Sequence, residues 1–238
     1  MSTTIRLITF DLDDTLWDVR PALEAAEAAQ WSYLTARFPS LALAATPREH
    51  VADLRRKLLE DKPELAHHIS LFRQSFIERL LLHHGVPGGE AESAASEAFA
   101  AFLSQRHEVV LYDNAQSVLN TLGRQFQLGA LTNGNADVRK TEIGSCFDYA
   151  WRAEEFGVSK PDPALFHRAF EKAGVSAGEV IHIGDCHDND VSGAISAGAK
   201  AIWFTPDGGV SEIASGVVKE LLDLPAAIER LTGHKGLI

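Results

Sequence analysis

Four aspartates could act together if the fold brings them to one place: Asp11, Asp13, Asp185 and Asp190. Two unit charges about 4 Å apart repel by roughly 4 kcal/mol at an effective dielectric constant near 20. A hard cation with oxygen ligands would relieve that repulsion, and Mg²⁺ prefers such ligands and often bridges to phosphate. No set of thiolates and imidazoles accompanies the aspartates, so zinc is a poorer fit. The pattern favours magnesium-assisted phosphate chemistry.

Phosphoryl transfer needs positioning and charge neutralisation more than unusual reactive groups. One carboxylate can serve as the nucleophile, and a second can protonate the leaving alkoxide and later deprotonate water. The Thr132 hydroxyl and the backbone N–H groups around Asn133 and Gly134 could hold the phosphate oxygens that are not transferred. Lys160 could bring a positive charge to the transition state.

The elements that must position these residues alternate between strand and helix. Short apolar stretches predict strands, and helical patterns lie between them. The predicted strands are residues 5–10, 126–131, 147–151, 180–183 and 199–204, and the predicted helices are residues 115–125, 163–173, 190–198 and 221–231. Such alternation predicts a parallel sheet with right-handed crossovers, whose ligands bind beyond the carboxyl ends of the strands. Three strands end in polar clusters, so we expect these clusters to open onto one edge of the sheet.

A long segment between the first two strands has a different character. Residues 20–106 are rich in Ala, Leu, Glu, Gln and Arg, with helical spacing and almost no strand signal. Pro39, Pro47, Pro63 and the Gly85–Gly89 stretch divide it into about four helices. We therefore predict an α/β fold with two domains, a core of residues 1–17 and 109–238 and a helical insertion of residues 18–108.

The composition limits the classes of partner. The chain has 238 residues, 45% of them apolar, and a net charge of −11. An acidic surface repels polyanions, so nucleic acids and anionic membranes are poor partners. No long uncharged apolar run and no secretory signal is recognisable, and Cys146 and Cys186 form no disulfide framework. We expect a cytoplasmic protein, monomeric or weakly dimeric, that acts on a small phosphorylated metabolite.

Four motifs in order resemble the signature of the haloacid dehalogenase (HAD) superfamily. The first motif of the family, D-x-D-x-T, matches residues 11–15, and the second, a strand that ends in Ser or Thr, matches Thr132. The third motif, a Lys commonly followed by Pro, matches Lys160-Pro161. The fourth, G-D-x(3–4)-D, matches Gly184-Asp185 and Asp190. The resemblance implies a Rossmann-like core, and it implies that the helical insertion is a C1 cap that closes over the substrate.

The resemblance also implies a role for each matched residue. Asp11 would be the nucleophile and a metal ligand, and Asp13 the general acid/base, which would bind Mg²⁺ through its backbone carbonyl. Thr132 and Lys160 would hold phosphate. Asp185 would ligate Mg²⁺, and Asp190 would support the metal site.

Asp13 separates the reaction classes of this superfamily. Its dehalogenases have no carboxylate at the matching place and use no magnesium, because a leaving halide needs no proton. Asp13 therefore favours a phosphatase. The alternatives are a phosphomutase or phosphotransferase on the same scaffold, a non-catalytic metal-binding regulator and, least of all, a dehalogenase.

Several segments are similar to one bacterial subgroup of these phosphatases, which acts on flavin-pathway phosphates. They are ITFDLDDTLWDVRP, LTNGNA, SKP, HIGD and PELAHHISLFR. This likeness implies a part in riboflavin biosynthesis, with 5-amino-6-(5-phospho-D-ribitylamino)uracil or flavin mononucleotide as substrate. Our candidates for cap-side substrate contacts are Trp17, Arg20, His67 and Arg73, since an aromatic ring could stack on the substrate and Arg could pair with a polar head. Asp188 is either a helix N-terminal charge or a further ligand.

Overall fold

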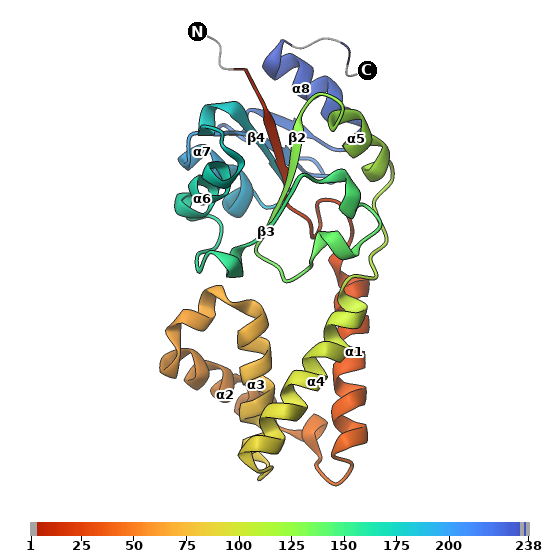
Figure 1. Ribbon diagram of the computed structural model, residues 1–238, viewed down its shortest axis with the longest axis vertical. Coiled ribbons are helices and arrows are strands. Elements are labelled where there is room, and N and C mark those ends of the chain that lie inside the picture. Colours follow the sequence, from red (N-terminus) through yellow and green to blue (C-terminus); the bar gives the residue numbers. More distant parts are fainter. Residues whose placement is uncertain (1–3, 234–235, 237–238) are drawn as a thin grey trace. The chain divides into compact units, whose positions relative to one another are not determined.

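A computed structural model describes residues 4–233 and 236 (Figure 1). Six parallel strands form one sheet in the order β3-β2-β1-β4-β5-β6. The strands are β1 (Leu7–Phe10), β2 (Gln127–Thr132), β3 (Tyr149–Arg152), β4 (Val180–Gly184), β5 (Lys200–Phe204) and β6 (Gly216–Val218). This arrangement confirms the predicted α/β class and the parallel sheet.

The register of the central strands explains why their polar ends meet. Phe10, the last residue of β1, lies opposite Ala130 of β2 and Ile183 of β4. The Asp11 backbone N–H continues this pairing and donates to the Ile183 carbonyl at 2.8 Å. The three strands therefore end at nearly the same level of the sheet.

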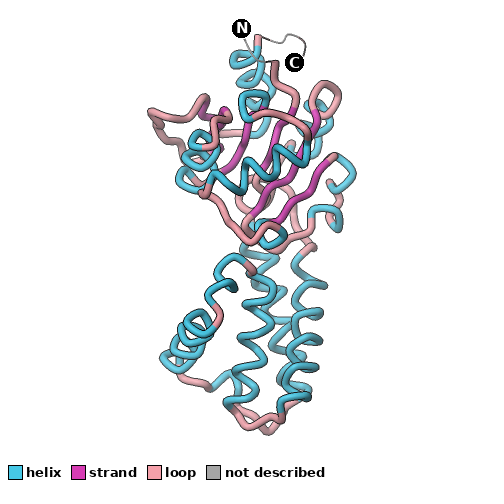
Figure 2. The backbone as a smooth tube through the Cα atoms, turned by 60° about the vertical axis from the view of Figure 1, so that its left-hand side comes forward, coloured by secondary structure: helices cyan, strands magenta, loops and turns pink. Residues whose placement is uncertain are grey.

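Helices cover both faces of this sheet (Figures 1 and 2). Helices α5 (Ala115–Leu122) and α8 (Leu224–Thr232) pack on one face, in a core cluster that includes Ile8 and Phe10. Helices α6 (Pro163–Ala173) and α7 (Gly193–Ser196) pack on the other, in a cluster that includes Leu7. Since β1 contributes alternate side chains to the two clusters, it is buried on both faces, as a central parallel strand should be.

The chain divides into two compact units, one of residues up to Val19 and from Val109 onward, and one of residues Arg20–Glu108. The second unit consists of the predicted four helices, α1 (Val19–Arg37), α2 (Arg48–Asp61), α3 (Ile69–His83) and α4 (Gly88–Arg106). Its own core contains Leu34, Leu80 and Ala98. The fold is thus a parallel-sheet core with a helical insertion between β1 and β2.

Two elements differ from the sequence-based expectation. The helix expected over residues 190–198 begins earlier, as a π-helical turn at His187–Ser192 that continues into α7. Strand β6 was not predicted, because three residues are too few to show an alternating pattern. Short 3-10 segments lie at Leu43–Ala45, Pro63–His67, Val138–Lys140, Gly144–Cys146, Ala153–Glu155, Ala177–Glu179 and Leu221–Asp223. None of the helices formed by the described residues is long and apolar enough to cross a membrane.

Candidate active site

The carboxyl ends of β1, β2 and β4 line one pocket of about 220 Å³ in the core unit. Segments far apart in the sequence meet there. The lining residues are Asp11, Asp13, Asp14, Thr132, Asn133, Gly134, Lys160, Asp185, Cys186, Asn189 and Asp190. The structure therefore gathers all the residues that the sequence predicted to act in catalysis, hold phosphate or bind metal in the core.

Lys160 forms ion pairs with two of the carboxylates. Its Nζ lies 2.6 Å from Asp11 Oδ1 and 2.6 Å from Asp190 Oδ1. All three side chains are buried. A buried charge is tolerated only where it is paired and hydrogen-bonded, so each of the three groups depends on the others.

The Asn133 side chain forms two hydrogen bonds with the backbone of Lys160. The Lys160 backbone N–H donates to Asn133 Oδ1 at 2.8 Å, and Asn133 Nδ2 donates to the Lys160 carbonyl at 2.9 Å. The Gly134 backbone N–H donates to Thr132 Oγ1 at 2.9 Å. The Asn133 side chain is therefore a clamp that places Lys160, while Thr132 and Gly134 form a tight turn in the pocket wall.

A second set of contacts positions Asp190. The Cys186 backbone N–H donates to its Oδ2 at 3.0 Å, and His182 Nε2 lies 3.1 Å from its Oδ1. Thr9 Oγ1 lies 2.8 Å from the other ring nitrogen of this buried histidine. Gly184 leaves the room for this arrangement, because a Cβ there would lie 2.2 Å from Asp190 Cγ.

Burial and the neighbouring charges together set the pKa values of Asp11, Lys160 and Asp190. It raises the pKa of Asp11 to about 8, since Lys160 only partly offsets the lost hydration. Burial alone would lower the pKa of Lys160, but Asp11 and Asp190 outweigh it and hold that pKa above its ordinary value. Burial alone would raise the pKa of Asp190, but Lys160 and His182 keep it below its usual range. Lys160 therefore stays protonated, but its positive charge does not fully stabilise the ionised form of Asp11.

Asp185 completes the acidic cluster. The Thr15 hydroxyl donates to Asp185 Oδ1 at 3.1 Å, and Trp203 Nε1 donates to its backbone carbonyl at 2.7 Å. Burial and the nearby Asp190 raise the pKa of Asp185 to about 6. Carboxylate oxygens of Asp11, Asp185 and Asp190 all lie within 4.8 Å of one another.

This donor set fits a cation. Three carboxylates at this spacing carry more negative charge than Lys160 alone balances. Burial, with a smaller contribution from the neighbouring carboxylates, raises the pKa values of Asp11 and Asp185. Oxygen-only donors are the ligands of a hard divalent ion. The cluster is therefore a metal-binding acidic site.

Asp13 lies in the same pocket beside a strained turn. Asp14 has a positive φ of 58° and its backbone N–H donates to the Trp17 carbonyl at 2.8 Å. Trp17 Nε1 donates in turn to Asp13 Oδ1 at 2.9 Å. The turn thus folds the chain back so that an indole N–H orients the second aspartate.

A family model of haloacid dehalogenase-like hydrolases matches residues 5–198. This chain belongs to that family. The membership of the HAD superfamily expected from the sequence is thereby confirmed, and the helical insertion with the parallel sheet corresponds to a HAD core with a C1 cap.

Individual HAD proteins resemble the chain over most of its length. The 5-amino-6-(5-phospho-D-ribitylamino)uracil phosphatase YigB of Escherichia coli K12 is 34% identical over 86% of this chain and 85% of its own. The N-acylneuraminate-9-phosphatase of Rattus norvegicus is 28% identical over 60% and 62%. A solved structure described as 2-haloacid dehalogenase from Pseudomonas syringae pv. Tomato DC3000 is 39% identical, covers 95% of this chain and 99% of its own, and has a TM-score of 0.90.

The phosphatase relatives and the family match together show that the chain is a HAD-family phosphatase. The presence of Asp13 agrees with that class, since dehalogenation requires no proton donor for the leaving group.

One predicted contact is wrong. We expected Trp17 to offer its ring to the substrate, but the side chain is fully buried in the core cluster of α5 and α8. Its backbone also bridges to Leu111, which holds the ring inward. Trp17 contributes to the site by donating a hydrogen bond from its indole N–H to Asp13 instead.

The other cap-side candidates lie in the helical unit. Arg20 and His67 are exposed, and Arg73 lines a pocket within that unit. Their contact with substrate stays a prediction, as does the binding of metal by the Asp13 carbonyl. The Asp188 side chain is 92% exposed and lies outside the acidic cluster, which favours the surface-charge interpretation.

Sequence reasoning missed three residues that support the site, Thr15, His182 and Trp203. His182 had a usable signal, because it is the one polar residue inside the apolar strand β4. Thr15 had another, as the last residue of the D-x-D-x-T motif. Nothing near Trp203 in the sequence pointed to its bond with Asp185.

Proposed function

We propose that the chain is a Mg²⁺-dependent phosphatase of a small phosphometabolite, and that Asp11 becomes phosphorylated during turnover. The arrangement that carries this proposal is the cluster of Asp11, Asp185 and Asp190 oxygens within 4.8 Å, with Lys160 bonded to two of them. Mg²⁺ held by these carboxylates would neutralise phosphate charge and polarise the phosphoryl group.

The chain's own residues account for the two chemical steps. Asp11 attacks the phosphorus while Asp13 gives a proton to the leaving oxygen, so that the alcohol departs neutral. Asp13 then takes a proton from water, and that water displaces phosphate from Asp11. Lys160 remains protonated through both steps and stabilises the negative charge that develops beside Asp11.

The substrate we propose is 5-amino-6-(5-phospho-D-ribitylamino)uracil, with flavin mononucleotide as the other flavin-pathway compound. Support comes from the 34% identity to YigB, which is described as acting on the first of these. The HAD resemblance also supports a cap that closes over the bound substrate and excludes water.

A second candidate is dehalogenation, which the 39% identical structure described as a 2-haloacid dehalogenase favours. In that reaction Asp11 would displace halide from carbon, and Asp13 would have no proton to supply. The two candidates therefore differ in their need for Asp13 and for metal.

One assay separates them. Phosphate release from p-nitrophenyl phosphate and from both flavin-pathway phosphates is measured with Mg²⁺ and with EDTA, and halide release from 2-chloropropionate is measured in parallel. We expect phosphate release that EDTA and Asp11→Asn abolish for all three substrates, and that Asp13→Asn abolishes for the two flavin-pathway phosphates. Asp113→Asn is the matched control, because Asp113 is an exposed aspartate of the same unit outside the pocket. Metal-independent halide release without phosphate release would defeat the proposal.

A further inference from the structure

The loop between β5 and β6, residues 205–215, is bonded to the π-helical turn that follows β4. Ser211 Oγ lies 2.8 Å from Nε2 of His187, which is the first residue of that turn. The Ile213 and Ala214 backbone N–H groups donate to the same oxygen at 3.3 Å and 3.0 Å. Since these two groups occupy its lone pairs, the Ser211 hydroxyl is left to donate its hydrogen to the histidine ring. We call residues 205–215 the β5–β6 loop.

The same loop holds the Trp203 indole in place. The His187 ring stands edge-on to the indole, with centroids 5.0 Å apart and an interplanar angle of 78°. Gly209 lies against the six-membered ring, because a Cβ there would lie 2.5 Å from two of its carbons. Only glycine therefore fits beside the indole as it now lies. His187 on one side and the loop backbone on another thus fix the direction of the indole N–H.

That N–H restrains the backbone of Asp185. Trp203 Nε1 donates to the Asp185 carbonyl at 2.7 Å. On the other side of the residue, the Asp185 backbone N–H donates to Thr15 Oγ1 at 3.1 Å, and the Thr15 hydroxyl donates to Asp185 Oδ1 at 3.1 Å. The peptide groups before and after Asp185 are therefore both held, one by Thr15 and one by Trp203.

Asp185 needs this restraint more than the other two carboxylates of the cluster. Lys160 forms ion pairs with Asp11 and Asp190, and both of those side chains are buried, whereas Asp185 is only half-buried. Carboxylates whose oxygens lie within 4.8 Å of one another repel, so the least confined of them would turn away before a cation arrives. Neutral hydrogen-bond donors are what keep Asp185 directed at the cluster.

We propose that Trp203 and Ser211 are positioning residues for the cation, because the β5–β6 loop holds Trp203 and Trp203 holds Asp185 in the orientation that completes the ligand set. This inference rests on the Mg²⁺-dependent function proposed above. Groups that orient a metal ligand without touching the metal typically change metal affinity roughly 10–100-fold when they are removed. The effect should therefore appear in the affinity for Mg²⁺, while kcat at saturating Mg²⁺ stays near that of the wild type.

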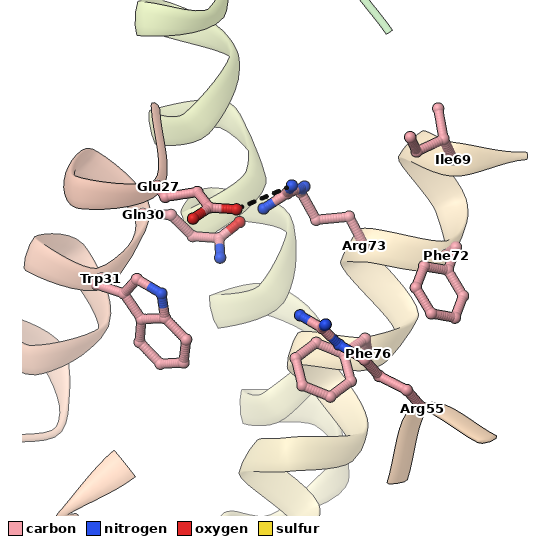
Figure 3. Close-up of a pocket in the computed structure, with 8 residues that line it drawn as sticks. All are labelled: Glu27, Gln30, Trp31, Arg55, Ile69, Phe72, Arg73 and Phe76. Atoms are coloured by element: carbon pink, nitrogen blue, oxygen red, sulfur yellow. Dashed lines mark hydrogen bonds and ion pairs between the residues drawn. The ribbon is translucent and has the colours of Figure 1, made fainter. Parts of the chain in front are cut away.

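The first test replaces Trp203 by Phe, which keeps an aromatic ring but has no N–H donor. The melting temperature of the full-length protein over a series of MgCl₂ concentrations, with EDTA as the metal-free reference, gives the dissociation constant of Mg²⁺. We expect this constant to rise about tenfold in Trp203→Phe. Trp31→Phe should leave it unchanged. Trp31 is the matched control, because it is also half-buried but lies in a pocket of about 280 Å³ within the helical unit (Figure 3).

Two further variants change the β5–β6 loop and keep the indole N–H. Ser211→Ala removes the hydroxyl that bonds to the π-helical turn, and Gly209→Ala places a methyl group where the indole now lies. Both should weaken Mg²⁺ binding. Gly89→Ala should not, since a Cβ there would meet nothing within 4 Å. In a double variant with Trp203→Phe, Gly209→Ala should add little, because both changes act through the same indole.

The outcomes separate this inference from the proposed function. An unchanged Mg²⁺ dissociation constant in Trp203→Phe would overturn the inference and leave Trp203 with a packing role alone. An equal loss of affinity in Trp31→Phe would overturn it too, because the loss would then not depend on the bond to Asp185. If Trp203→Phe does not fold, unchanged affinity in both loop variants would overturn it. A wild-type melting temperature that does not respond to MgCl₂ would instead contradict the Mg²⁺-dependent function itself.

Discussion

Replacement of Trp17 by Phe tests how Asp13 is positioned. Trp17 Nε1 donates to Asp13 Oδ1 at 2.9 Å, and the rest of the indole is packed in the core. Phe keeps most of the ring but has no donor. A hydrogen bond to a charged group contributes about 1.5–3 kcal/mol, which corresponds to a factor of about 10 to 150 in rate if all of it is lost in the transition state. We expect kcat to decrease by a factor that lies within that range.

The choice of substrate sharpens this test. An alkyl phosphate leaves as a basic alkoxide that needs the Asp13 proton, whereas p-nitrophenolate leaves without one. The decrease in kcat should therefore be larger for flavin mononucleotide than for p-nitrophenyl phosphate, and KM should change little. Steady-state kinetics with both substrates at saturating Mg²⁺ measure the difference.

The matched control for the lost indole is Trp151→Phe. Trp151 is a buried tryptophan on the opposite face of the sheet, stacked on Tyr149 with ring centroids 4.9 Å apart. The Trp151→Phe variant removes a similar volume from the core and removes no hydrogen bond to Asp13. If Trp17→Phe and Trp151→Phe had the same kcat on flavin mononucleotide, or if Trp17→Phe raised KM alone, our account of Asp13 would be wrong.

Two further predictions concern the acidic cluster. In EDTA the folded protein should lose stability as pH rises from about 4 to about 8, because the pKa of Asp11 is raised to about 8 and that of Asp185 to about 6, so the folded state binds protons that the unfolded state has released. Mg²⁺ should raise the melting temperature most at pH 8, and a melting temperature in EDTA that rises over this range would contradict the charge assignment. Gly184→Ala should lower kcat at least about tenfold and cost about 1–3 kcal/mol of stability, because its Cβ would lie 2.2 Å from Asp190 Cγ. Denaturant unfolding and the phosphatase assay measure both effects, and normal activity would show that Asp190 can move freely.

Local signals in the sequence were sufficient for much of the core. Helix α6 spans the predicted residues 163–173, and the Asp162 side chain before it accepts the Ala164 backbone N–H at 2.9 Å. Gly174 ends the helix with a left-handed φ of 66°. Caps depend on neighbouring residues only, so they can be read from the sequence.

The convergence of the candidate catalytic residues was also predictable, because parallel strands share one carboxyl edge. What the sequence could not show is how long-range contacts direct individual side chains. Trp17 turns inward because its backbone bridges to Leu111, far along the chain. The Asn133 side chain forms two hydrogen bonds with the Lys160 backbone, because the end of β2 lies beside the segment that precedes α6. Phosphate binding by the backbone N–H groups around Asn133 stays a prediction.

The π-helical turn after β4 has the same kind of cause. Asp190 must reach back to Lys160, His182 and the Cys186 N–H, and the turn that achieves this departs from regular α-helix. Periodicity describes regular helices, so it placed the helix start at Asp190 rather than at His187. Local rules therefore failed where the backbone is shaped by the site.

The central claim is that Asp11 carries the phosphoryl group, and chemical trapping tests it most directly. Borohydride added during turnover reduces an acyl phosphate to a primary alcohol, which would convert Asp11 to homoserine, and peptide mass spectrometry locates the change. We expect homoserine at position 11, dependent on both substrate and Mg²⁺ and missing from Asp11→Asn. Rapid turnover with an unmodified Asp11, or with homoserine at position 13 instead, would contradict the account.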